Sequence, residues 1–84
     1  MSLSQIRRIR NPERRAAEAN EYLRAQEAAS KRDLARIREV RDKAAREMLA
    51  MKDEDGAWVY RPADVARTLK MTRPSVSQRF GKRG

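Results

Sequence analysis

Polar side chains that could bind nucleic acid follow one another closely near the C-terminal end of the chain. They are Arg73, Ser75, Ser77, Gln78 and Arg79. Arginine can form two parallel hydrogen bonds with guanine, glutamine can do the same with adenine, and serine can bind bases or phosphates. These residue types in this order predict contact with DNA, and the alternative is a polar helix face that is only solvated.

A short helix is predicted to begin at Arg61 or Pro62 and to end near Lys70. Proline suits the first helical turn, because an N–H group there would have no intrahelical partner. Asp64 lies in the same turn, where a negative charge favours the positive end of the helix. Spacings of one, three and four residues place apolar side chains on one helical face, and here these are Val65, Ala66 and Leu69.

A second short helix is predicted to follow at once, with Thr72 as its N-cap and as a further side chain expected to contact DNA. Pro74 disfavours helical geometry at the residue before it but is tolerated in a first turn. Because Pro74 has no N–H, the Thr72 hydroxyl is expected to accept a hydrogen bond from Ser75. Val76 and Phe80 are four residues apart and are expected to face inward, which leaves the polar side chains outside.

These residues resemble a known family of DNA-binding domains. The run Asp64-Val65-Ala66, then Leu69, Met71-Thr72-Arg73 and Val76-Ser77-Gln78, is similar to the helix-turn-helix of bacterial regulators and of sigma factor region 4. The resemblance implies that Ala66 is the small residue where the two helices approach. It implies that residues 73–79 are a recognition helix, and that the core residues are Val65, Leu69, Met71 and Val76.

The sequence departs from that family at two positions. Lys70 stands where such motifs often have glycine, and the last apolar residue is Phe80, where many members have it one residue earlier, at the position of Arg79. The departures predict a recognition helix that is rotated or that ends in a distorted turn.

The composition points to an anionic partner. The chain of 84 residues has 21 Lys and Arg against 12 Asp and Glu, a net charge of +9, and Asp64 is the only acid in residues 61–84. So short a chain allows one domain with a thin core. Without cysteine or histidine it has no disulfides, no common zinc ligands and no histidine acid-base catalysis. We therefore predict no enzyme activity, no metal and no cofactor.

Residues 12–52 are predicted to be helical throughout, because Asn11 can cap a helix that Pro12 opens and no glycine or proline follows before Lys52. The region is either one helix or a hairpin of two, since Ser30 followed by Asp33 resembles a second capping signal.

An apolar stripe in the second half of this region has two possible roles. It could form an intramolecular core with the helix-turn-helix, or it could be the seam of a coiled-coil dimer that Arg41 interrupts. The residues that would contact a partner or a second copy are Leu34, Ile37, Ala44, Met48 and, outside the stripe, Trp58.

Residues 53–60 read as an acidic turn followed by a short extended segment. We expect Trp58 and Tyr60 to cover the core between the long helical region and the motif, with partner binding as the alternative. No strand pattern follows Phe80, so a complete wing is not expected. Residues 81–84 are a basic tail in which Lys82 and Arg83 could contact phosphates.

Residues 1–11 read as a basic N-terminal arm with three open interpretations. It could be an amphipathic helix for a partner or a membrane surface, an arm that contacts DNA, or a disordered leader. The arm contacts would come from Arg7, Arg8 and Arg10. No apolar run approaches the length of a membrane helix, so we expect a cytoplasmic, nucleoid-associated protein without a membrane partner.

The sequence as a whole predicts an all-α protein in which a long helix or helical hairpin packs on a C-terminal helix-turn-helix spanning residues 61–80. Its predicted function is that of a small transcriptional regulator of bacterial or phage type, which binds the major groove of double-stranded DNA as a homodimer. The alternative is a helical adaptor that binds a protein partner such as the transcription machinery.

Overall fold

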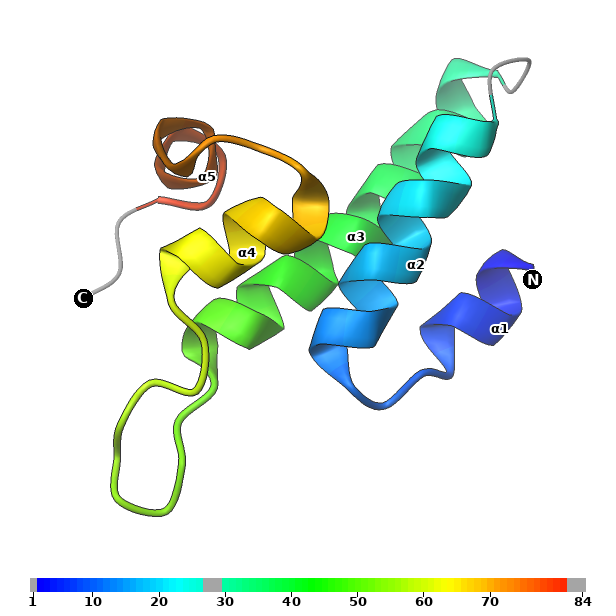
Figure 1. The fold of residues 1–84 in the computed structure, drawn as a ribbon. Helices are drawn as coiled ribbons and strands as arrows, with labels where there is room; N and C mark the ends of the chain where they lie inside the picture. Colours follow the sequence, from blue (N-terminus) through cyan, green and yellow to red (C-terminus); the bar gives the residue numbers. More distant parts are fainter. Residues whose placement is uncertain (1, 27–29, 82–84) are drawn as a thin grey trace.

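The computed structural model describes residues 2–26 and 30–81, and these residues form α-helices and no strand (Figure 1). This confirms the all-α prediction. The helices are α1 (Leu3–Arg7), α2 (Pro12–Ala25), α3 (Lys31–Ala50), α4 (Pro62–Leu69) and α5 (Arg73–Phe80).

The helices α2 and α3 form a long antiparallel hairpin (Figure 1). The Asn11 side chain caps α2 by accepting a hydrogen bond of 3.0 Å from the backbone N–H of Arg14. Ser30 caps α3 in the same way, accepting from the N–H of Asp33 at 3.2 Å. The second capping signal therefore marks a true helix start, and of the two arrangements that the sequence allowed, the hairpin is the one that forms.

The main core lies where the hairpin meets α4 and α5. Small side chains let the helices approach closely there, and the larger Met48, Val65 and Val76 fill the space between them. The buried residues of this core are Ala16, Ala44, Ala45, Met48, Val65, Ala66, Leu69 and Val76. The second half of the helical region thus packs on the helix-turn-helix, as the apolar stripe predicted.

The N-terminal segment folds back onto the hairpin. Ser2 and Gln5 cap α1 reciprocally, and Ile6 is only 1% exposed, packed in a small core with Ala19 and Val40. The guanidinium of Arg15 also donates to the carbonyl of Ile9 at 2.8 Å. The amphipathic helix therefore forms, and its apolar side is covered by its own chain. Contact of the arginines of this segment with DNA stays a prediction.

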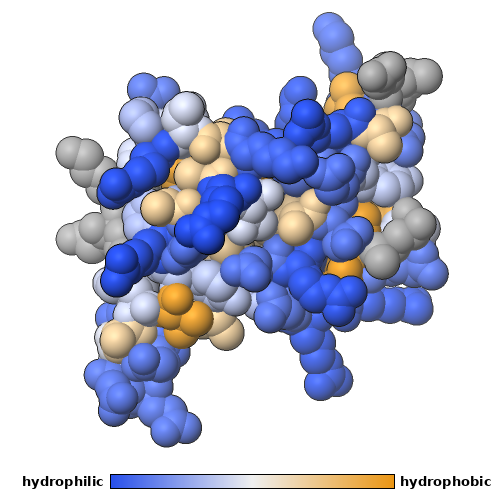
Figure 2. Space-filling view, in the orientation of Figure 1, coloured by the Kyte–Doolittle hydropathy of each residue, from blue (hydrophilic) through white to orange (hydrophobic). Residues whose placement is uncertain are grey.

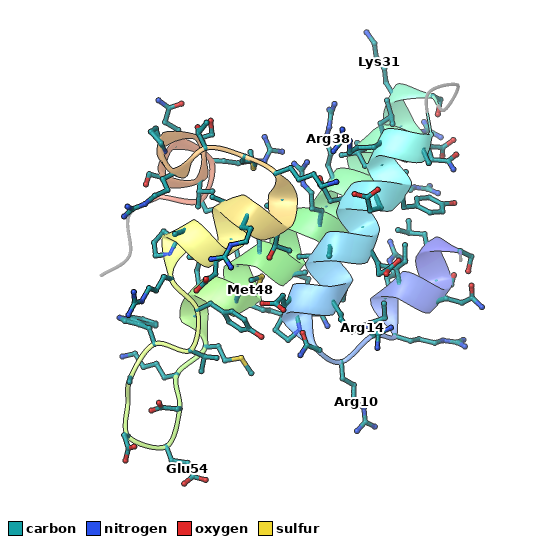
Figure 3. All side chains as sticks on the ribbon, viewed as in Figure 1. Arg10, Arg14, Lys31, Arg38, Met48 and Glu54 are labelled. Atoms are coloured by element: carbon teal, nitrogen blue, oxygen red, sulfur yellow. The ribbon has the colours of Figure 1, made fainter. Side chains whose placement is uncertain are left out.

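The connection between α3 and α4 is a narrow loop that projects from the helical body, with Glu54 at its tip (Figures 1 and 3). Lys52 and Trp58 form an isolated antiparallel bridge, and the Asp53 side chain accepts from two backbone N–H groups of the turn. Tyr60 packs against the main core, whereas Trp58 is 42% exposed beneath the Lys52 ammonium group. The expectation that both aromatic residues cover the core holds for Tyr60 alone.

None of the helices formed by residues 2–26 and 30–81 combines the length and the apolar character that crossing a membrane requires.

Candidate nucleic-acid interface

The helices α4 and α5 have the capping arrangement that the sequence predicts. The carboxylate of Asp64 accepts from the backbone N–H of Arg61 at 2.8 Å, which fixes the start of α4. The Thr72 hydroxyl accepts from the N–H of Ser75 at 3.3 Å, and the two hydroxyl groups lie 2.8 Å apart. At the start of each helix, the side chain that accepts the hydrogen bond and the backbone N–H that donates it are three residues apart.

The turn between the helices runs through a left-handed residue. Lys70 has φ 55°, and the next N–H, that of Met71, bonds back to the carbonyl of Ala66 at 2.8 Å. Glycine adopts this conformation without steric cost, so Lys70 is the unusual residue here. Its ammonium group lies 3.0 Å from a carboxylate oxygen of Glu21 on α2, and this hydrogen bond lowers the pKa of Glu21.

A buried polar side chain of α2 holds the end of α4. The amide of Asn20, a residue that is 4% exposed, donates to the carbonyl of Leu69 at 3.2 Å. The last carbonyl groups of a helix lack intrahelical partners, so this bond satisfies one of them and ties the turn to the hairpin. Asn20 is not among the residues predicted from the sequence to form the site, although a polar residue beside Ala16 and Ala19 on the buried side of α2 is a usable signal.

The helix α5 presents polar side chains on one side and packs through the other. Val76 is 1% exposed and Phe80 lies partly buried against the main core, whereas Arg73, Ser77 and Gln78 are exposed. The helix forms one edge of the molecule (Figure 1), and the surface on that side is largely hydrophilic (Figure 2). Among the side chains expected to contact DNA, Thr72 and Ser75 are engaged with each other at the first turn.

Arg79 differs from the other members of this set because it is bonded to the body of the protein. Its guanidinium donates twice to one carboxylate oxygen of Asp42 on α3, at 2.8 and 3.1 Å. The other oxygen of Asp42 accepts from Arg41 at 3.0 Å. A forked guanidinium committed to a carboxylate cannot present the same donors to a base edge, so the expected role of Arg79 as a DNA-reading residue is not supported by this geometry.

The charges in this cluster shift the ionisation of both partners. Burial by itself would raise the pKa of Asp42, but the hydrogen bond from Arg79 and the charge of Arg41 outweigh it, and the pKa of Asp42 lies below its usual range. The same hydrogen bond raises the pKa of Arg79. The pair is therefore ionised at neutral pH.

The residues expected to form a partner or dimer interface are mostly inside the chain. Ile37 is 3% exposed, and Ala44 and Met48 are fully covered by the neighbouring helices. A second copy cannot contact them in this fold, which favours the intramolecular reading of the apolar stripe. Leu34 is half-buried and Trp58 is exposed.

The structure separates the other basic candidates from α5. Arg7, Arg8 and Arg10 are exposed near α1, on the opposite side of the hairpin from α5, and Arg10 projects away from the body (Figures 1 and 3). They cannot extend the α5 surface as a continuous arm. Lys82 and Arg83, expected to contact phosphates, lie outside the described residues.

Comparisons with protein families, with curated proteins and with solved structures each gave no match for this chain.

Proposed function

We propose that this chain is a small helix-turn-helix DNA-binding protein that regulates transcription, with α5 as its recognition helix in the major groove. The observation that carries the proposal is the arrangement of α4, a short turn and α5 in which Val76 is buried while Arg73, Ser77 and Gln78 stay exposed. A helix of this size fits the major groove, where these side chain types discriminate between base pairs.

The charge of the chain supports the same proposal. The net charge is +9, and α5 has no acidic residue. Asp42 is the carboxylate that is bonded to Arg79 of α5. It is largely buried and accepts hydrogen bonds from two guanidinium groups. A polyanion approaching α5 would therefore meet arginine and neutral polar groups.

A binding assay with duplex DNA tests this function. Affinity of the wild-type chain should fall steeply as salt concentration rises, because bound phosphates release counterions. Arg73→Ala and Gln78→Ala should each cost about 1 to 3 kcal/mol of binding free energy on a selected sequence and should relax the preference for particular bases. Val76→Ala is not a useful test, because it opens a cavity in the core and disturbs the fold.

Selection of duplexes from a random pool gives the preferred sequence that this assay needs. A protein that binds no duplex even in dilute buffer, or whose selected sequences are random, does not have the proposed function. Glu54→Gln, at the tip of the projecting loop, is the control substitution and should leave base preference unchanged.

A second candidate function is that of an adaptor that binds a protein. The observation in its favour is a group of exposed apolar side chains at the projecting loop, where Met51, Trp58 and Val59 are 42%, 42% and 44% exposed. This function predicts no selective duplex binding. It also predicts that Trp58→Ala weakens capture of a transcription-machinery subunit, while Gln78→Ala has no effect on it.

A further inference from the structure

One row of side chains on α3 reaches the last turn of α5 and carries two arginines outside the candidate interface. Arg38, Asp42 and Arg46 follow at intervals of four residues, so they form one row along α3. Asp42 bonds Arg79 at 2.8 Å, and the Arg46 guanidinium lies 5.5 Å from the centre of the Phe80 ring. Both partners belong to the last turn of α5, so the row passes that end of α5, with Arg38 one turn before Asp42.

The exposed charge of this row is positive despite the carboxylate at its centre. The Asp42 side chain is only 12% exposed and forms ion pairs with Arg41 and Arg79. Arg38 and Arg46 are exposed, and neither forms an ion pair with another described residue. Arg38 projects outward from α3 (Figure 3).

We infer that Arg38 and Arg46 bind the DNA phosphate backbone that borders the groove occupied by α5. This inference rests on the proposed function. Because Asp42 bonds Arg79 and Arg46 lies over the Phe80 ring, α5 seated in a groove about 12 Å wide would bring this row of α3 toward the phosphates that border the groove. Arginine is well suited to them, because its planar fork can donate two hydrogen bonds to one phosphate group.

The sequence offers a matched control on the same helix. Arg36 is also exposed, but at 100° per residue it lies about 200° around the helix axis from Arg38. Arg36→Ala and Arg38→Ala therefore remove the same charge from opposite sides of α3. Any effect of net charge alone is shared by the two variants.

The experiment measures binding of wild type, Arg38→Ala and Arg36→Ala to a fluorescein-labelled, mixed-sequence DNA duplex over a range of salt concentrations. The plot of log affinity against log salt should be shallower by about 1 for Arg38→Ala than for Arg36→Ala. Between about 50 and 200 mM salt, the advantage of wild type over Arg38→Ala should shrink roughly threefold. Arg46→Ala should act in the same direction, while base preference stays unchanged.

Equal slopes for Arg38→Ala and Arg36→Ala, with a wild type that does bind, overturn this inference and leave the proposed function intact. A wild type that binds no duplex overturns both. Circular dichroism checks that each variant is folded. Arg38→Gln keeps most of the aliphatic part of the side chain and replaces Arg38→Ala in the comparison should that variant lose packing and helix.

Discussion

Asp42 accepts hydrogen bonds from Arg41 on its own helix and from Arg79 on α5, so a single carboxylate ties the last turn of α5 to α3. Arg79 lies within the polar run that could read DNA, but its Nε and Nη2 groups donate to Asp42. Arg73, Ser77 and Gln78 are exposed, and no described side chain is bonded to them. At the scale of residues, α5 thus combines an arginine bonded to α3 with the exposed polar side chains that the proposed function assigns to base contact.

Replacing Asp42 by asparagine should destabilise the fold in a pH-dependent way. The pKa of Asp42 is lowered in the folded protein, so its ionised form contributes stability above the unfolded pKa of about 3.9. That contribution is lost as the pH falls through the lower, folded pKa. Asp42→Asn should therefore cost about 1 to 3 kcal/mol at neutral pH, because two guanidinium groups lose their anion, and progressively less below about pH 4.

Urea denaturation of both proteins across this pH range measures the effect. Asp55→Asn, at the exposed turn of the projecting loop, is the matched control and should change stability little at any pH. If the unfolding free energies of wild type and Asp42→Asn differ by the same amount at neutral and at acidic pH, the ionised form of Asp42 contributes nothing to stability.

The elements α4 and α5 are short, and each is held by contacts with the hairpin. Asn20 bonds the last residue of α4, Glu21 pairs with the turn, and Asp42 bonds the last turn of α5. Helices of this length are marginal on their own in water. The helix-turn-helix therefore depends on α2 and α3 for its stability as well as for its orientation.

Replacing Lys70 by glycine should stabilise the turn. A residue with a Cβ atom in the left-handed region pays a steric cost of about 1 to 2 kcal/mol, and Lys70 has φ 55°. Its ion pair with Glu21 joins two exposed side chains, which contributes little. Since glycine also gains entropy in the unfolded chain, the net increase in unfolding free energy should be about 0.5 to 1 kcal/mol.

Thermal denaturation compares Lys70→Gly with Lys70→Ala, which removes the same ion pair but keeps the strain. The expected order of stability places glycine above wild type and alanine at or below it. If the Lys70→Gly variant is no more stable than the Lys70→Ala variant, the left-handed conformation of residue 70 has no measurable cost in unfolding free energy.

The whole molecule is small and elongated, with principal extents of 43 × 27 × 17 Å. A single recognition helix makes few base contacts, and two-fold-related helix-turn-helix proteins place their recognition helices about 34 Å apart on one face of the duplex. Since the apolar stripe of α3 is buried, a second copy would have to pair through another surface. The exposed side chains at the projecting loop are one such surface.

Light scattering of the DNA complex should give two chains of 9.8 kDa per duplex. Footprinting should show two protected half-sites whose centres are about 10 base pairs apart or a multiple of that spacing. One chain per duplex with a single protected site would contradict the dimer and would leave the contact of α5 with DNA unaffected.

The sequence by itself determined that the chain is helical and where α2, α4 and α5 begin, and it indicated the start of α3. Asn11, Ser30 and Thr72 each accept a hydrogen bond from an N–H three residues ahead, so the signal and its partner lie in the same short stretch of chain. The same holds for the alternation of apolar and polar positions in α4 and α5, which is why the inward positions of Val65, Val76 and Phe80 could be predicted.

Only the tertiary structure decided which polar residues of the motif are available. The bonds from Arg79 to Asp42 and from Asn20 to Leu69 join residues 37 and 49 positions apart. The burial of Ile6 likewise depends on the hairpin that α2 and α3 form. Such pairings follow from the angles at which helices pack, and local propensity does not encode these angles. The sequence therefore indicated the polar residues of α5 but could not distinguish the one that forms an ion pair with α3 from those that have no such bond.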